Sequence, residues 1–246
     1  RPGWVEVLRR IISRPSSVNP EPATPAPEAI LFDLDGTLID TAPDLAGALN
    51  AVFSEYQYEA LPEAVIRSHI SKGAAGLLAL QFDDPPGSAS FAARRQRFLD
   101  IYRSRIALES QLFAGMASVL DTIESGGGKW GIVTNKPAWL TAPLLKALSL
   151  EARPGCVISG DTASAPKPDP APLLLAAELL AVSPTRCLYI GDAERDVVAA
   201  HAAGMRAVIA RYGYFAVDDN PDAWQADGEI GAPEDLLNWQ IGRAHV

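Results

Sequence analysis

The amino-acid sequence predicts an α/β fold, a Rossmann-like parallel sheet core with an inserted helical cap domain. In the later part of the 246-residue chain, short β-rich runs alternate with helical patterns. This order is typical of a parallel sheet covered by helices on both faces. The first two β-rich runs are separated by roughly 100 residues of mostly helical pattern, far more than the roughly 12 that one crossover connection needs. This interval is therefore expected to form a separate helical domain.

The core is expected from 29–42 and 114–240, and the helical cap from 43–113. Buried apolar runs predict strands at 29–34, 130–134, 156–159, 187–190 and 207–210. Periodic patterns predict core helices at 116–125, 137–148, 168–181 and 193–203, the last of them stopped by Gly204. In the cap, they predict helices at 43–56, 62–71, 74–82 and 89–107.

Two terminal segments are expected to lie outside the folded unit. Residues 1–28 are rich in proline, which removes backbone hydrogen-bond donors, and are expected to be an extension or a linker. Residues 241–246 have no helix or strand pattern, resemble translated sequencing adapter and are expected to be a non-native tail. Neither segment enters the functional prediction.

Composition and charge exclude several classes of function. The 21 Lys and Arg residues against 30 Asp and Glu give a net charge of -9, which repels nucleic acid and anionic membranes. No apolar run approaches the ~18 residues of a spanning helix. Cys156 and Cys187 lie in apolar runs, which predicts packed thiols in a reducing, cytoplasmic setting. We expect neither a nucleic-acid partner nor a membrane partner, and the sequence leaves the oligomeric state open.

The first chemical motif is an apolar strand that ends in two acids, Ile30-Leu-Phe-Asp-Leu-Asp-Gly-Thr-Leu38. Asp33 and Asp35 stand two residues apart, so both project to the same side at the carboxyl end of the strand. Open α/β sheets bind their ligands at this edge. The alternative interpretation is a pair of acids in a turn.

A second acidic motif, Leu188-Tyr-Ile-Gly-Asp-Ala-Glu-Arg-Asp196, ends another predicted strand. Asp192 and Asp196 would share one face of the helix that begins here, although acids also stabilise helix N-termini. With Asp33 and Asp35 they would place three or four carboxylates at one edge of the sheet. Such a hard, oxygen-rich site is of the kind that Mg²⁺ accepts.

Two further motifs are typical of phosphate binding. Thr134-Asn135-Lys136 follows the second predicted strand, and Lys167 stands in Ala165-Pro-Lys-Pro-Asp169. A hydroxyl, backbone N–H groups and a lysine are what phosphate oxygens need. Each motif alone is also typical of a turn. The predicted phosphate-binding residues are Thr134, Asn135 and Lys167.

Together, and in this order, the four motifs resemble those of the haloacid dehalogenase superfamily of phosphohydrolases, over residues 29–238. The family has a Rossmann-like core with a helical cap inserted after the first motif. Dehalogenases lack an acid at the place of Asp35, so its presence indicates phosphate chemistry. The resemblance implies a cytoplasmic hydrolase of the phosphatase type that acts on a small phosphorylated substrate.

The resemblance also implies a role for each site residue. Asp33 is the implied nucleophile, and Asp35 the implied acid and then base. Thr134 and Lys167 would hold the phosphoryl oxygens. Mg²⁺ would bind Asp33, the Asp35 backbone carbonyl and Asp192, with Asp196 ligating or orienting.

In the cap, Lys72 and Gly73 of the Ser71-Lys72-Gly73-Ala74 turn are expected to contact the substrate, the alternative being a plain solvated turn.

Substrate preference is expected to come from regions outside the four motifs. Residues 33–44, 133–137 and 167–170 are similar to bacterial phosphoglycolate phosphatases, which act in carbohydrate metabolism. Residues 112–116 and 211–224 resemble the branch that acts on N-acetylmuramic acid 6-phosphate in peptidoglycan recycling, which we favour. A sugar-phosphate mutase and a non-catalytic phosphate-binding regulator remain as alternatives.

Overall fold

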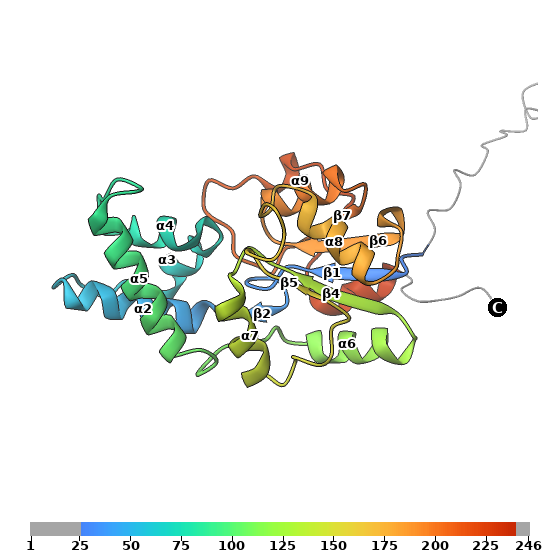
Figure 1. The fold of residues 1–246 in the computed structure, drawn as a ribbon, viewed down its shortest axis with the longest axis horizontal. Helices are drawn as coiled ribbons and strands as arrows, with labels where there is room; N and C mark the ends of the chain where they lie inside the picture. The colour runs from blue at the N-terminus through green and yellow to red at the C-terminus, as the bar shows by residue number, and fades with distance from the viewer. Residues whose placement is uncertain (1–25, 240–246) are drawn as a thin grey trace, which may run out of the picture.

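The structure, a computed structural model, describes residues 26–239 and is centred on a six-stranded sheet (Figure 1). All neighbouring strands are parallel, in the order β5-β4-β1-β6-β7-β8. In chain order these strands are β1 (Ala29–Phe32), β4 (Lys129–Val133), β5 (Val157–Ile158), β6 (Cys187–Gly191), β7 (Arg206–Ala210) and β8 (Gly228–Ile230). The predicted parallel α/β core is confirmed.

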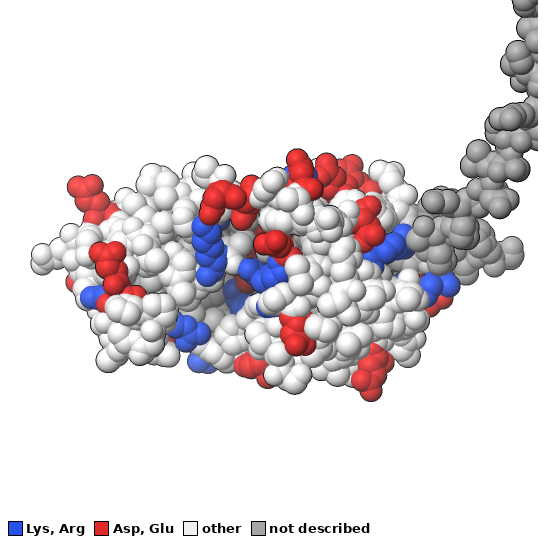
Figure 2. All heavy atoms as spheres, turned by 90° about the horizontal axis from the view of Figure 1, so that it is seen from above, with Lys and Arg blue, Asp and Glu red and all other residues white. Residues whose placement is uncertain are grey.

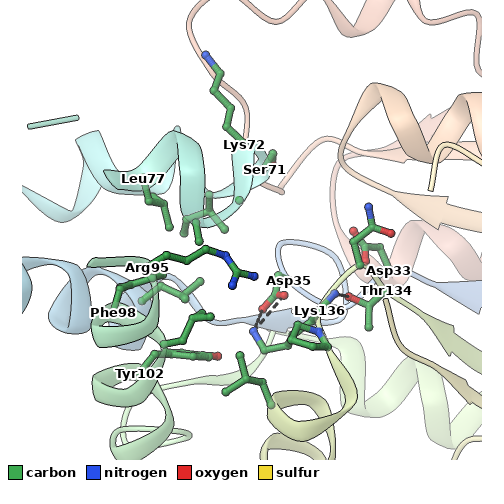
Figure 3. A pocket seen from close by; sticks show the side chains of 18 of the residues that line it. Asp33, Asp35, Ser71, Lys72, Leu77, Arg95, Phe98, Tyr102, Thr134 and Lys136 are labelled. Carbon is green, nitrogen blue, oxygen red and sulfur yellow. Dashed lines mark hydrogen bonds and ion pairs between the residues drawn. The ribbon is translucent and has the colours of Figure 1, made fainter. Parts of the chain in front are cut away.

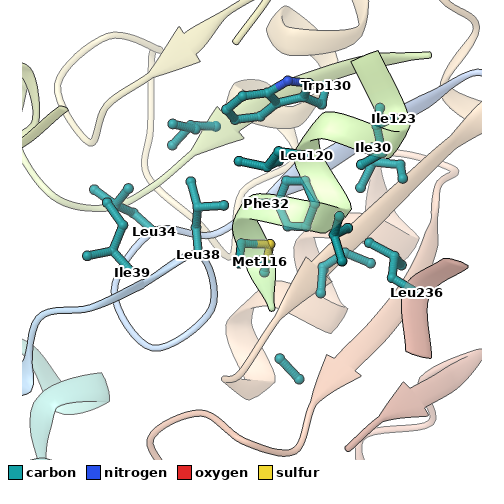
Figure 4. Close-up of a cluster of buried hydrophobic side chains, with 14 of the residues drawn as sticks. Ile30, Phe32, Leu34, Leu38, Ile39, Met116, Leu120, Ile123, Trp130 and Leu236 are labelled. Carbon is teal, nitrogen blue, oxygen red and sulfur yellow. The ribbon is translucent and has the colours of Figure 1, made fainter. Parts of the chain in front are cut away.

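Alternation along β1 divides the core between the two faces of the sheet. Ile30 and Phe32 pack with Trp130 and with α6 (Met116–Ser125), as Figure 4 shows. Leu31 belongs to a second cluster. No β1 side chain is exposed. The residues that follow β1 are therefore attached to a strand that is packed on both faces.

Helices cover both faces of the sheet. In Figure 1, α8 (Ala171–Leu179) and α9 (Glu194–Ala202) lie above the sheet, and α6 and α7 (Ala138–Ala147) lie below it. The remaining short helices of the core are η2 (Pro184–Arg186), η3 (Pro221–Ala223) and η4 (Pro233–Trp239). This arrangement leaves the carboxyl ends of the strands facing the cap.

The cap is a helical lobe with its own apolar cluster, at the left of Figure 1. Its helices are α2 (Ala42–Glu55), α3 (Glu63–Arg67), η1 (Ile70–Lys72), α4 (Gly73–Leu78) and α5 (Ala89–Ser104). Phe53, Phe98 and Tyr102 are among the large side chains buried inside it. Since Leu140 and Tyr214 of the core join this cluster, the cap is packed against the core.

A two-stranded antiparallel pair joins the cap to the core. β2 (Ile39–Asp40) is the outgoing connection and β3 (Gln111–Leu112) the returning one, with Ile39 opposite Leu112. Phe113 N–H also donates to the Leu38 carbonyl at 3.3 Å. Both connections therefore pass side by side.

Several helices are shorter than the sequence predicts. The helix predicted at 62–71 ends at Arg67 and is followed by η1. Gly73, with a φ of 66°, is the first residue of α4, which ends at Leu78 rather than 82. The helix predicted at 89–107 ends at Ser104, and Ala107 has a φ of 57°. The helix predicted at 168–181 begins only at Ala171 and ends at Leu179, since Pro170 disfavours helical backbone at Asp169.

The cysteines, the last strand and the chain ends can also be compared with the sequence predictions. Cys156 and Cys187 are free, buried thiols, as predicted, and burial raises the pKa of each to about 11. β8 was not predicted, because its Gly and Glu residues lack a β-rich pattern. No helix within residues 26–239 has the length and apolar character needed to cross a membrane. Residues 1–25 of the predicted extension and the predicted tail lie outside the described part of the chain.

Candidate active site

The carboxyl ends of β1 and β6 bring together three buried carboxylates. Asp33 follows β1, Asp192 follows β6, and Asp196 lies in the first turn of α9. One oxygen from each side chain lies within 4.8 Å of the others. All three are at most 3% exposed, so water offers them little screening.

Lys167 is the cation of this cluster. Its ammonium nitrogen lies 3.0 Å from Asp33 Oδ1 and 2.7 Å from Asp196 Oδ1. It also donates to the Val133 carbonyl and the Tyr189 hydroxyl, at 3.0 and 2.6 Å. This side chain is fully buried, so its position is fixed by four oxygen atoms.

The electrostatics of the cluster favour a further positive charge. Burial raises the pKa of Asp192 well above its ordinary value, the Asp33 and Asp196 carboxylates add to the rise, and the Tyr214 N–H opposes it. Burial also raises the pKa of Asp196, whereas Lys167 acts in the opposite direction. Arg195 lowers the pKa of both carboxyls as well. The three carboxylates nevertheless outnumber the two cations, Lys167 and Arg195, that act on them.

The cluster fits a small divalent cation that prefers oxygen ligands, such as Mg²⁺. The backbone approaches closely at Gly36 and Gly213, where a Cβ atom would stand 2.1 Å from Asp192 Oδ2 and 2.3 Å from Asp192 Cβ. Gly36 also has a φ of 87°, which favours glycine. Asp196 accepts hydrogen bonds on both oxygens, from Lys167 and from the Ala193 N–H. Asp192 does so as well, from Thr37 Oγ1 and from the Tyr214 N–H, so both carboxylates are held in place.

The Asp35 side chain lies outside this cluster, although Asp35 stands only two residues from Asp33. Its carboxylate accepts from Lys136 Nζ at 2.9 Å and from Thr41 Oγ1 at 2.7 Å. Lys136 Nζ lies 4.5 Å from the centre of the buried Tyr102 ring. Burial alone would lower the pKa of Lys136, but Asp35 and Tyr102 outweigh this effect and raise it.

Thr134 and Asn135 lie beside the cluster at the end of β4, and both face the cavity. Thr134 Oγ1 accepts from the Lys136 N–H at 3.1 Å. The Asn135 carboxamide donates to the Lys167 carbonyl and accepts from the Lys167 N–H, both at 2.9 Å. The Asn135 side chain therefore fixes the Lys167 backbone. The predicted contact of Asn135 with phosphate would have to come from its backbone.

A cavity of about 310 Å³ lies between the cap and the core at this site (Figure 3). Asp33, Asp35 and Thr134 form its core side, and Leu77, Phe98 and Leu99 form part of its cap side. Figure 2 shows Lys and Arg side chains gathered in the hollow between the two lobes, whereas acidic residues are spread over the surface. These side chains would attract an anionic ligand to the hollow.

The predicted substrate residues Lys72 and Gly73 line the same cavity at its rim. Figure 3 shows the Lys72 side chain directed away from Asp35, and its ammonium pairs with Asp218 at 3.2 Å. The segment is tied to the core, because Ser71 Oγ donates to the Tyr214 carbonyl at 2.9 Å and Arg195 Nη1 donates to the Ser71 carbonyl at 2.5 Å.

Sequence reasoning missed four residues of the site. Lys136 stood inside a recognised motif but was not assigned a contact. Arg195 stands inside the second acidic motif. Arg95 and Tyr102 are seven apart in a helical pattern, a spacing that places them on one face, but only packing shows which face meets the cavity.

The comparisons with known proteins agree on one family. A family model described as haloacid dehalogenase-like hydrolase matches residues 30–210. A phosphoglycolate phosphatase of Xanthomonas campestris is 43% identical over 210 residues, which cover 85% of this chain and 95% of the relative. An N-acetylmuramic acid 6-phosphate phosphatase of Pseudomonas putida is 41% identical over 208 residues, which cover 85% and 93%.

Among solved structures, a predicted phosphoglycolate phosphatase of Haemophilus somnus has a TM-score of 0.77 and 26% sequence identity. The match covers 87% of this chain and 97% of that structure. Cap and core therefore recur together in this relative.

Proposed function

Because the chain belongs to the haloacid dehalogenase-like hydrolase family and is a phosphoric monoester hydrolase, we propose that it hydrolyses a small phosphomonoester through an aspartyl phosphate on Asp33, with Mg²⁺ as its cofactor. The observation that carries this proposal is the contact of Lys167 with Asp33 inside the carboxylate cluster. This contact supports the proposal, because the proposed nucleophile lies 3.0 Å from the cation proposed to bind the phosphoryl oxygens.

The reaction proceeds in two balanced steps. An Asp33 oxygen attacks phosphorus, the bond from phosphorus to the leaving oxygen breaks, and Asp35 gives its proton to that oxygen. Asp35, now a carboxylate, then takes a proton from water as the water oxygen attacks the same phosphorus. The Asp33 carboxylate and inorganic phosphate are released, and Asp35 has regained its proton.

The surroundings of the two acids support these different roles. Asp33 is 3% exposed and is held beside Lys167, so its oxygen is fixed for attack. Asp35 faces the cavity and is oriented by Lys136 and Thr41, so it can serve the leaving oxygen and then water.

Asp33, Asp192 and the Asp35 backbone carbonyl are the groups proposed to hold Mg²⁺, with Asp196 ligating or orienting. When bound, Mg²⁺ would offset the negative charge of the phosphoryl oxygens. Lys167 contributes positive charge from the protein, and Thr134 contributes a hydroxyl at the edge of the cavity.

We favour N-acetylmuramic acid 6-phosphate as the substrate. The segments that resemble this branch border the site: Tyr214 N–H donates to Asp192 at 2.7 Å, and the Phe113 and Tyr212 rings lie 4.9 Å apart beside the joint between cap and core. A cavity of about 310 Å³ falls within the usual range for small-molecule sites, which begins near 300 Å³.

The second candidate is 2-phosphoglycolate. It is favoured by the relative with 43% identity, which bears the name phosphoglycolate phosphatase. The identity to the N-acetylmuramic acid 6-phosphate phosphatase, 41%, is too similar to rank the two substrates.

A panel of phosphomonoesters tests the proposal. We expect kcat/KM for N-acetylmuramic acid 6-phosphate to exceed that for 2-phosphoglycolate by at least ~10-fold, about 1.4 kcal/mol in transition-state binding. Phosphate release is measured with Mg²⁺ and with EDTA. Equal or better turnover of 2-phosphoglycolate reverses the ranking, and full turnover in EDTA contradicts the metal requirement.

A further inference from the structure

Four cationic side chains line the cavity between cap and core, and three of them already have an acceptor in the protein. The acceptors are Asp218 for Lys72, Asp35 for Lys136, and the Ser71 carbonyl for Arg195. The fourth cation is Arg95. Within residues 26–239, its guanidinium has no ion pair and no hydrogen bond.

The isolation of Arg95 is not a property of its whole helix. Arg94 pairs with Asp84, and Arg97 pairs with Glu55, so two arginines close to it on α5 have acidic partners. Neither of them lines the cavity. Figure 3 shows the Arg95 guanidinium directed from α5 into the cavity, toward the side that holds Asp35 and Lys136.

The same face of α5 carries a second polar side chain. Residues 95, 98, 99 and 102 form one stripe along the cavity. Tyr102 is fully buried, and its hydroxyl has no hydrogen-bond partner among the described residues. Its ring lies beside Lys136 Nζ, 4.5 Å from the ring centre. The stripe therefore runs along the cavity from the Arg95 guanidinium to the ring beside Lys136, with apolar side chains between them.

The stripe is separate from the groups that serve the phosphoryl group. Lys167 and Thr134 belong to the core, whereas Arg95 and Tyr102 stand on the cap. Seven residues of helix span about 10.5 Å, and the apolar Phe98 and Leu99 lie between the two polar groups. A substrate held at Asp33 would therefore meet Arg95 through another part of its structure.

We propose that Arg95 binds a carboxylate of the substrate, so that the enzyme selects phosphomonoesters that carry a second anionic group. This inference rests on the proposed phosphatase function and deepens it. The planar guanidinium donates two parallel hydrogen bonds to a carboxylate. Both candidate substrates carry a carboxylate, so Arg95 separates them from neutral sugar phosphates rather than from each other.

Two matched pairs of substrates test the proposal. N-acetylglucosamine 6-phosphate is N-acetylmuramic acid 6-phosphate without the O-lactyl group that carries the carboxylate. The amide of 2-phosphoglycolate replaces the carboxylate of 2-phosphoglycolate by a neutral group of nearly the same size. p-Nitrophenyl phosphate reports the phosphoryl machinery alone. The wild-type enzyme is expected to prefer the acid over its neutral counterpart in at least one pair, by about 10- to 100-fold in kcat/KM, the factor of a charge-assisted hydrogen bond.

The variant Arg95→Gln is expected to lose this preference and to keep its activity on p-nitrophenyl phosphate. Arg95→Lys, which keeps the charge but not the planar fork, is expected to fall between the two. Arg97→Gln is the matched control, because it removes the same charge from α5 outside the cavity, and it should retain the wild-type preference. Thermal melting checks that each variant is folded.

The outcomes distinguish a failure of the proposed phosphatase function from a failure of the role proposed for Arg95. No hydrolysis of any phosphomonoester by the wild type overturns the proposed function, and this inference with it. Hydrolysis of p-nitrophenyl phosphate without a preference for either acid overturns only the assignment of Arg95. So does an Arg95→Gln variant that retains the preference, or one that loses activity equally on all five compounds.

Discussion

Asp33 and Asp35 stand two residues apart, but their side chains have different neighbours. Asp33 contacts the buried Lys167, and Asp35 contacts Lys136 and Thr41. The turn at Gly36, with its φ of 87°, allows the chain to leave the strand between these two environments. Two identical carboxylates can therefore perform different chemistry.

This difference predicts two distinct losses. Asp33→Asn should abolish the covalent phosphoenzyme, because the amide is not a nucleophile for phosphorus. Asp35→Asn should keep the nucleophile and lower the rate by about 10² to 10⁴, the typical contribution of acid–base catalysis. Trapping of labelled phosphoenzyme and steady-state rates measure the two effects.

Asp100→Asn, a change at an exposed acid on α5, serves as the control and should leave both measurements unchanged. A labelled phosphoenzyme in Asp33→Asn would show that another residue is the nucleophile.

At the scale of the element, α5 depends on its first turn for stability. The Ser88 side chain accepts from the Phe91 N–H at 3.2 Å and caps the helix. Ser88→Ala should lower the free energy of unfolding by about 1 kcal/mol, measured as a lower urea midpoint with an unchanged slope. Ser104→Ala, at the exposed other end of the helix, should have a much smaller effect. Equal losses for both would argue against the cap.

The elements also show how far sequence patterns reach. The strands that Asp33 and Asp192 follow were predictable, because strands buried on both faces of a parallel sheet are continuous apolar runs. β8 was not, since Gly228 and Glu229 carry no such signal. Arg95 could be placed on a helix but not in a site, because its relation to the cavity depends on how α5 packs against the rest of the cap.

At the scale of the whole molecule, the cluster between β1 and β6 links metal binding to stability. A ligand that binds only the folded state stabilises it, by about 2.7 kcal/mol at 100 times its Kd. Mg²⁺ should therefore raise the melting temperature. Asp192→Asn should remove most of this rise, and it should leave the metal-free protein at least as stable, because a carboxylate with an unfavourable buried charge is gone.

Calorimetry with and without Mg²⁺ measures both effects. Asp121→Asn, a change at an exposed acid on α6, should respond to Mg²⁺ as the wild type does. A rise that persists in Asp192→Asn would place the metal elsewhere.

The antiparallel pair of β2 and β3 has a consequence for how the cap can change in evolution. Because Ile39 and Leu112 are partners across this pair, the cap enters and leaves the core at one place. A segment with such adjacent ends can be lengthened, shortened or exchanged as a cassette without any strand of the parallel sheet changing its neighbours. Natural variation can thus replace the surface that carries Arg95 while the residues that handle phosphate are inherited unaltered.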